Sequence, residues 1–402
     1  MMRKKALTYG LIGIMVAGTL IPTYGTADDV VDSTVKPEVV IEAVAEQETI
    51  MALSLDEAIE YALANSRDMD IQRLELDKSK ISYDQNIKAV KAAEKDMDIT
   101  IDVPRKYEVT ADDNVNKALV KNGASRKSVE LGYQVAKWNV DMKTNQIKYN
   151  VEKAYFDFLQ MKNELEIAKE NFDLSQKQYN HGKLKLDAGM ISKQQSLGLE
   201  MGLSQAQSVL DSTKMLYDLQ LMSFQNTLGL PFEQQISLTD VIEYKVYEPI
   251  NLVESIKSAL VNNTGIKTAQ ENFVISELTL KAVSGRFPEI TYRYKEQAVV
   301  VQQAAKNLET AHNGVEMGVR SAYLNLLTAE KQIKTYQLTI QQAQESVRIA
   351  ELSFDLGQNT SIDVTQANIN LMNAKSNLSK QIHAFNMALL DYEYSIGIGK
   401  GF

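Results

Sequence analysis

The stretch SFDLGQNTSIDVTQAN, Ser353 to Asn368, decides how the sequence around it is read. There a glycine and a run of small polar residues interrupt dense apolar patterning. Before the interruption, apolar residues recur at every seventh position, at Val319, Leu326, Ile333, Ile340, Val347 and Phe354. After it, the same spacing resumes at Val364, Leu371, Leu378, Phe385 and Tyr392. A seven-residue repeat is the signature of a coiled-coil seam, so the stretch is predicted to be the turn of a long helical hairpin.

The same pattern occurs once more, earlier in the chain. Val151–Gly229 aligns without a gap to Val319–Gly397, and LKLDAG meets LSFDLG at the two predicted turns. Shorter segments precede both copies, because LDEAIEYALANS (Leu55–Ser66) pairs with LVESIKSALVNN (Leu252–Asn263). The first copy is longer than the second between these landmarks. Two copies of one helical unit indicate a duplicated chain.

These patterns predict a mainly α fold of two tandem repeats of long antiparallel coiled-coil helices. The repeats are expected over 51–230 and 251–402, joined by a connection over 231–250 in which ISL and EYKVY are candidate short strands. A helix from about Gln302 to Leu356 would be roughly 80 Å long at 1.5 Å per residue. A helix of that length fits an elongated coiled-coil hairpin and is too long for a compact globular domain.

The first residues have the pattern of a secretory signal, predicted over 1–27 with cleavage after Ala27. MMRKK is a charged region, ALTYGLIGIMVAG an apolar one, and TYGTADD carries the small residues of a cleavage site. An uncleaved membrane anchor fits less well, because polar residues and Pro22 shorten the apolar run. Residues 28–50 are acidic and are expected to form a flexible lead-in. We therefore predict an exported protein.

Composition and motifs argue against several classes of function. The chain has no cysteine, so a thiolate metal site is impossible. Its net charge is −9, which makes nucleic acid a poor partner. His181, His312 and His383 lie far apart without metal-ligand spacing, and the last two are expected to be solvated. No phosphate-binding loop, dinucleotide fingerprint or serine elbow is present. We predict no enzyme activity, no cofactor and no metal.

In their order, the landmarks resemble the TolC (outer membrane efflux protein) family from about Leu53 to Gly399. The matching pieces are LSLDEAIEYALANS, AYFDFL, AYLNLL and FDLGQNTSIDVTQA. The last has the family's glycine followed six residues later by an aspartate that leads an aliphatic residue and an alanine, here Gly357, Asp363, Val364 and Ala367. The resemblance implies a homotrimeric exit duct of the cell envelope. It also implies two partners, a membrane-fusion adaptor and an ABC or proton-driven inner-membrane pump.

The resemblance further places both helix turns at the cell-facing end of the duct. It implies adaptor contacts at Gly189, Met190, Ile191, Ser192, Gly357, Gln358, Asn359 and Thr360. It implies a lumen constriction at Asp363 and Gln366, where threefold symmetry would make Asp363 a ring of carboxylates that attracts cations. From the residues alone, Asp363 also suits a helix N-terminal cap and the turn glycines suit helix ends, so both interpretations stay open.

The sequence departs from the family in the two gaps that normally hold transmembrane strands. MDITIDV (Met97–Val103) alternates until Pro104, and PEITYRYKEQ (Pro288–Gln297) alternates before a helical pattern. A spanning strand needs about 9–11 residues, so at most one short strand per gap is expected. We therefore expect a reduced barrel, with a short atypical barrel as the alternative, and the membrane contact stays open. The duct would lie in the outer membrane by resemblance, or end in the wall or at the surface without a barrel.

A coiled-coil spacer or tether of the envelope, without a lumen, is the rival function. Weak strand content suits it, whereas the duplication and the uncharged polar helix faces at Gln341, Gln344, Gln366 and Asn370 suit a duct.

Overall fold

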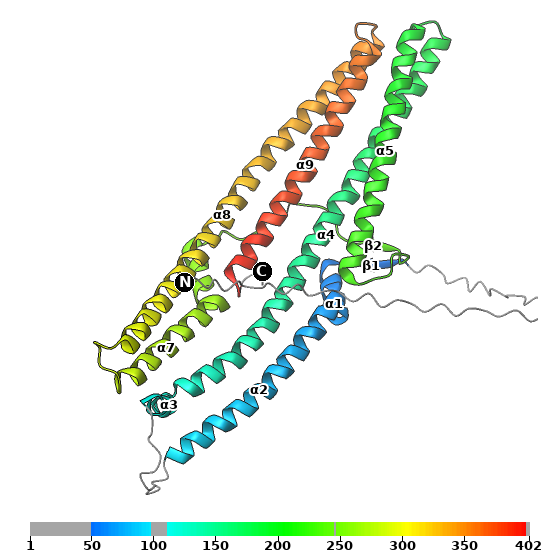
Figure 1. Ribbon diagram of the computed structural model, residues 1–402. Helices are drawn as coiled ribbons and strands as arrows, with labels where there is room; N and C mark the ends of the chain where they lie inside the picture. The colour runs from blue at the N-terminus through cyan, green and yellow to red at the C-terminus, as the bar shows by residue number, and fades with distance from the viewer. Residues whose placement is uncertain (1–49, 98–110, 245–246, 399–402) are drawn as a thin grey trace, which may run out of the picture. The chain divides into compact units, whose positions relative to one another are not determined.

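The computed structural model of the chain describes residues 50–97, 111–244 and 247–398 (Figure 1). The predicted signal segment with its cleavage site, nearly all of the acidic lead-in, and the candidate strand after Met97 lie outside these residues. Everything below concerns the described part of the chain.

Four long helices dominate the fold, and they come in two matching pairs. α4 (Ala124–Asp187) and α8 (Tyr292–Asp355) each have 64 residues, and α5 (Lys193–Leu228) and α9 (Ser361–Ile396) each have 36. The starts and ends of α4 and α5 lie 168 residues before those of α8 and α9, which is the offset of the alignment of the two copies. The 64-residue helices are roughly 96 Å long at 1.5 Å per residue. The predicted mainly α fold of long antiparallel helices is confirmed, although α8 begins at Tyr292, earlier than the expected Gln302.

Shorter helices accompany each long pair. They are α1 (Leu55–Asn65), α2 (Arg67–Met97), α3 (Ala111–Lys121), α6 (Leu252–Asn262) and α7 (Thr264–Ser284). α6 corresponds to α1 at both of its ends, and the start of α7 corresponds to the start of α2. Figure 1 shows α8 packed against α9 along one part of its length and against α7 along the other. In the described residues α3 has no counterpart, which accounts for part of the extra length of the first copy.

Two three-residue strands form the sheet of the described chain. β1 (Met51–Leu53) pairs in parallel with β2 (Ile236–Leu238), with Met51 opposite Ile236. The strand predicted at ISL is therefore confirmed. Its partner MAL was not predicted, because three residues carry too little alternation to recognise.

Two other strand predictions are wrong where the structure describes them. In EYKVY, Glu243, Tyr244 and Tyr247 are not in a strand. PEITYRYKEQ holds a turn and the start of α8, where Thr291 caps the helix by accepting a hydrogen bond from Tyr294 N at 3.4 Å. Ile290 and Tyr292 are 83% and 88% exposed, so the apolar alternation has no buried face to pack on.

The predicted heptad seams form the core of each hairpin. Val319, Leu326 and Phe385 are fully buried between α8 and α9. Between α4 and α5 the buried core contains Val151, which corresponds to Val319, and the aromatic Phe158 and Phe224, whose rings stack at 5.4 Å. Burying each such side chain contributes about 1.5–3 kcal/mol, so the seams stabilise the hairpins.

The connection between the two copies contacts both. Asp240 accepts hydrogen bonds from Tyr155 Oη at 2.6 Å and from Leu55 N at 3.3 Å, in the first copy. A few residues on, Tyr244 and Tyr247 donate to the two carboxylate oxygens of Glu330 on α8, at 2.9 and 2.8 Å. Side chains of the connection thus form hydrogen bonds with both α4 and α8.

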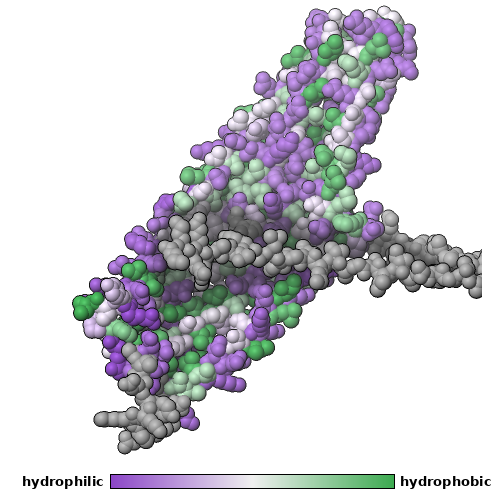
Figure 2. All heavy atoms as spheres, in the orientation of Figure 1, coloured by the Kyte–Doolittle hydropathy of each residue, from purple (hydrophilic) through white to green (hydrophobic). Residues whose placement is uncertain are grey.

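Hydrophilic and hydrophobic residues are mixed over the visible face of the helices (Figure 2). None of the described helices combines the length and the apolar character needed to cross a membrane.

Candidate functional site

The two turns between the paired helices are built in the same way. Gly189 and Gly357 adopt φ of 68° and 73°, the left-handed region that glycine enters without strain. The amide that follows each glycine closes the helix end, because Met190 N donates to Lys185 O and Gln358 N to Ser353 O, both at 2.8 Å. A Cβ on either glycine would meet no atom within 4 Å. Glycine is therefore favoured here by the backbone angle and not by a lack of space for a side chain.

Each following helix begins with a capping box. In α5, Ser192 Oγ accepts from Gln195 N at 3.2 Å, and Gln195 Oε1 accepts from Ser192 N at 2.9 Å. In α9, Thr360 Oγ1 accepts from Asp363 N at 3.4 Å, and Asp363 Oδ2 accepts from Thr360 N at 2.9 Å. These reciprocal bonds satisfy amide donors that a helix start leaves open.

A shared apolar cluster brings the two turns together at one end of the hairpins. It joins Leu199 of α5 to Val347 and Phe354 of α8 and to Val364 of α9, with Ile191 packed against it. Lys185 Nζ also pairs with Asp355 Oδ1 at 2.6 Å, linking the end of α4 to the end of α8. The sequence-predicted turn residues therefore lie at the same end of the molecule.

The eight predicted adaptor-contact residues lie on the surface of this end. Gly189, Met190, Ser192, Gly357, Gln358 and Thr360 are exposed, and Ile191 and Asn359 are half-buried. Neighbouring apolar side chains are exposed too, with Met190, Leu356 and Ile362 at 70%, 65% and 59%. The two turns therefore present both polar and apolar side chains to solvent.

Asp363 has a capping role in the structure. Its Oδ2 also accepts from Thr360 Oγ1, at 2.7 Å, and these bonds to Thr360 lower the pKa of the Asp363 carboxyl below its ordinary value. The side chain is exposed, as is that of Gln366 one turn later, whose Nε2 donates to Asn370 Oδ1 at 3.1 Å. The structure thus places both predicted constriction residues on the exposed start of α9.

Polar contacts join the two hairpins between α4 and α9, and no pattern in the sequence predicted them. Asp157 Oδ1 lies 2.7 Å from His383 Nε2, and Asn163 Nδ2 donates to Ser379 Oγ at 2.8 Å. Glu170 pairs with Lys375 further toward the turns. The prediction of a solvated His383 is wrong, because its side chain is only 23% exposed and its Nε2 lies next to Asp157 Oδ1. Apolar seams therefore hold each hairpin, and the two hairpins contact each other through these polar pairs and through the apolar cluster near the turns.

Apolar side chains are also exposed along helices at opposite edges of the helix row. Figure 1 shows α2 and α8 on opposite sides of this row, with α4 and α7 between them. On α2 these side chains are Ile71, Leu74 and Ile81, and on α8 they are Met317, Leu324 and Leu338, all more than half exposed. α5 adds Met201, Met215 and Leu219. Each edge thus carries a stripe that no described element covers.

No group of histidine, aspartate and glutamate side chains within the described ranges is placed to hold a metal ion.

In the comparison with known proteins, one segment of the chain matches a protein family. Residues 291–384 match the model of the family described as "Outer membrane efflux protein". Outer membrane protein TolC of Salmonella enteritidis is 30% identical over 94 residues, which are 23% of this chain and 19% of that protein. The match to this relative thus spans about a fifth of the relative's length. The segment that the family model matches contains the second turn with Asp363 and Gln366.

Two solved structures share the fold over most of the chain. The outer membrane protein VceC from Vibrio cholerae superposes with a TM-score of 0.63 over 86% of this chain and 96% of that one, at 12% identity. CusC superposes with a TM-score of 0.65 over 86% and 92%, at 14% identity. The long-helix fold thus extends over both copies, well beyond the segment that the family model matches.

Proposed function

We propose that this chain belongs to the outer membrane efflux protein family, whose model matches residues 291–384, and that it is one protomer of a homotrimeric efflux duct in the cell envelope. The observation that carries this proposal is the pair of equal hairpins whose turns lie together at one end. The duct is passive, and its energy comes from partner proteins.

The apolar edges support assembly from several copies. The apolar stripes on α2 and α5 lie on one edge of the protomer and the stripe on α8 on the other. In a head-to-tail assembly, the α8 stripe of one protomer would pack against the α2 and α5 stripes of the next. Such head-to-tail contacts close into a ring when the rotation between copies allows it. The number three rests on the family resemblance. A ring of this kind would place the helices around a lumen and would cover the exposed apolar side chains.

The turn end supports docking of a partner. Met190, Leu356 and Ile362 expose apolar surface there beside the polar turns, which suits an adaptor that contacts the turns through its own side chains. An adaptor of this kind would connect the duct to an inner-membrane pump of the ABC or proton-driven class.

Asp363 and Gln366 would line the constriction of such a duct. An aspartate of ordinary pKa is already ionised at neutral pH, and the bonds from Thr360 lower the pKa of Asp363 further, so three such carboxylates around an axis would attract cations. Capping and lining are compatible, because the carboxylate that accepts from Thr360 remains exposed.

The assembly is tested on the purified mature chain by native mass determination and by end-on views in negative stain. A hollow trimer is expected, and Leu324→Glu on the α8 edge should reduce it to monomers. Val253→Glu is the comparison variant, because Val253 is 77% exposed on α6 and belongs to neither apolar stripe. A monomer, or a solid rod, would contradict the duct and favour the spacer without a lumen.

The constriction has a separate test in planar-bilayer conductance. Asp363→Asn should leave trimers intact and weaken block by divalent cations, whereas Gln195→Asn at the corresponding position of the first copy should not change it. Unaltered cation block in Asp363→Asn would disprove the carboxylate ring without bearing on the duct itself.

A further inference from the structure

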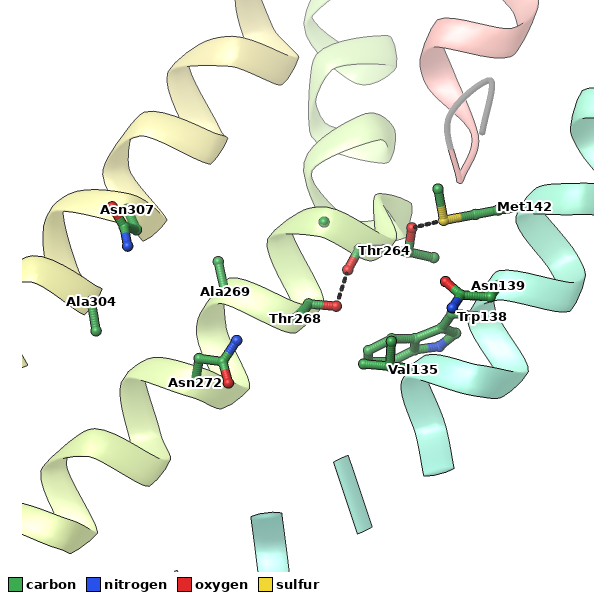
Figure 3. Close-up of a pocket in the computed structure, with 11 residues that line it drawn as sticks. Val135, Trp138, Asn139, Met142, Thr264, Thr268, Ala269, Asn272, Ala304 and Asn307 are labelled. Atoms are coloured by element: carbon green, nitrogen blue, oxygen red, sulfur yellow. Dashed lines mark hydrogen bonds between the residues drawn. The ribbon is translucent and has the colours of Figure 1, made fainter. Parts of the chain in front are cut away.

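A hollow of about 350 Å³ lies where the first copy meets the second, among α4, α7 and α8. Figure 3 shows side chains from all three helices around it, with those of α7 between the other two. Its volume is within the range of small-molecule sites, which begins at about 300 Å³. The hollow lies outside the helix turns and outside the edge stripes described above.

No charged side chain of the described residues lines this hollow. All eleven lining residues are uncharged, in a chain where 24% of residues carry a charge. A charged ligand would find no counter-charge here and would lose hydration on entering. The lining therefore selects for an uncharged molecule.

One wall of the hollow is apolar and carries an aromatic ring. Trp138, the chain's single tryptophan, is half-buried and extends from α4 toward α7, as Figure 3 shows. Val135 and Met142 flank it on the same helix. An indole of this kind offers a flat apolar face to a ring-shaped ligand.

Three asparagine side chains supply polar groups from three helices. Asn139 lies on α4, Asn272 on α7 and Asn307 on α8. All three line the hollow, and all three are solvent-exposed. Among the described residues none of these three amides has a hydrogen-bond partner. The hydroxyl groups of Thr264 and Thr268, in contrast, already donate to Met142 Sδ and to Thr264 O. Each free amide offers a carbonyl acceptor and two N–H donors.

We propose that this hollow binds an uncharged saccharide. A pyranose ring has an apolar face of C–H groups that fits the Trp138 indole, and an edge of hydroxyl groups that both donate and accept. Asn139, Asn272 and Asn307 match that edge, and the uncharged lining excludes acidic and basic sugars. The proposal does not depend on the duct, because the hollow is formed within one protomer.

The test uses the emission of Trp138, which is the only tryptophan signal of the full chain. Titration with maltose and with N,N′-diacetylchitobiose should give a saturable change in that emission for at least one of them. Glucuronate, as a charged probe of similar chemistry, should bind at least tenfold more weakly. Asn272→Leu and Asn307→Leu should each weaken the neutral disaccharide about tenfold, because a pair of hydrogen bonds is lost.

The matched control is Asn313→Leu, on the same helix as Asn307, exposed and outside the hollow. It should bind as the unaltered chain does, and circular dichroism should show equal helicity for all variants. Three results would overturn the saccharide site: no saturable change with either neutral disaccharide, equal binding of glucuronate, or unchanged binding in both Asn272→Leu and Asn307→Leu. The oligomeric state is measured separately, so failure here leaves the proposed duct untouched.

Discussion

Gly202 of α5 lies so close to Thr365 of α9 that a Cβ on the glycine would be 2.8 Å from the threonine Oγ1 and 3.0 Å from its Cγ2. One turn earlier, a Cβ on Gly198 would lie 2.5 Å from Ser361 Oγ. Two glycines one helical turn apart on the same face thus let the two hairpins approach each other near the turns. Through this contact α5, the second helix of the first hairpin, packs against α9, the second helix of the second hairpin.

Replacement of Gly202 by alanine should destabilise the protein despite alanine's better helix propensity. The new methyl group must displace Thr365, which costs about 1–3 kcal/mol, against a propensity gain of about 0.5–1 kcal/mol. Chemical denaturation measures the net change, and Thr365→Ala in the same chain should restore the loss. Gly318→Ala is the control, because a Cβ at Gly318 of α8 meets nothing within 4 Å, and it should stabilise. A stable Gly202→Ala variant would mean that α5 and α9 are further apart.

Asp363→Asn should lower the melting temperature near neutral pH, and the difference should vanish in acid. Hydrogen bonds from Thr360 lower the folded-state pKa of Asp363, so its contribution is present above the ordinary value of 3.8 and is lost as the pH falls through the folded value. Melting curves of both proteins between pH 7 and pH 2 test this. The first copy provides the control, because Gln195 caps α5 without a charge and Gln195→Ala should cost the same at every pH. A pH-independent loss for Asp363→Asn would contradict the carboxylate's role.

Asp157→Ala should weaken the contact between the hairpins by about 1 kcal/mol, since it removes the 2.7 Å partner of His383 Nε2. His383→Ala should cost a similar amount, and the double variant should cost less than the two added together, because the residues share one contact. Denaturation of the four proteins gives this coupling. For comparison, the exposed pair Glu316–Arg320 on α8 should show coupling within about 0.5 kcal/mol. Full additivity for Asp157 and His383 would show that their contact adds nothing.

Tyr247→Phe should cost about 1 kcal/mol near neutral pH by removing the hydrogen bond to Glu330. Burial, followed by the bond to Glu330 and its charge, raises the pKa of Tyr247 from 10.0 to about 12. The stability that Tyr247 contributes is therefore fully present below pH 10 and is lost as the pH rises through 12. Melting temperatures from pH 8 to pH 11.5 should fall more steeply for the unaltered chain than for Tyr247→Phe. Tyr292→Phe, at a residue 88% exposed, should match the unaltered chain.

The helical part of the fold was predictable because its signals are local. Val319 and Leu326 stand one heptad apart, and that spacing alone puts them on one helix face, where the structure buries both completely. Gly357 ends α8 through its own backbone angle, which no neighbour has to impose. The equal lengths of the two hairpins likewise follow from an alignment of the chain with itself.

The strand errors have a physical reason. PEITYRYKEQ alternates as a strand does, but alternation yields a strand only where one face is buried and a partner is present. Ile290 and Tyr292 stay exposed, and the cap at Thr291 starts α8 instead. β1 shows the opposite case, because Met51–Leu53 is a strand only by virtue of β2, which lies beyond the whole first hairpin in the sequence.

The sequence by itself determined the two long hairpins, their glycine turns and the candidate residues at those turns, because period and turn chemistry act over a few residues. Only the tertiary structure decided what meets across the molecule. It brought Asp157 to His383, placed Gly202 against Thr365, and gathered Trp138 with three asparagines of three helices around one hollow. Such contacts depend on how whole helices pack and rotate against one another, which no single segment encodes.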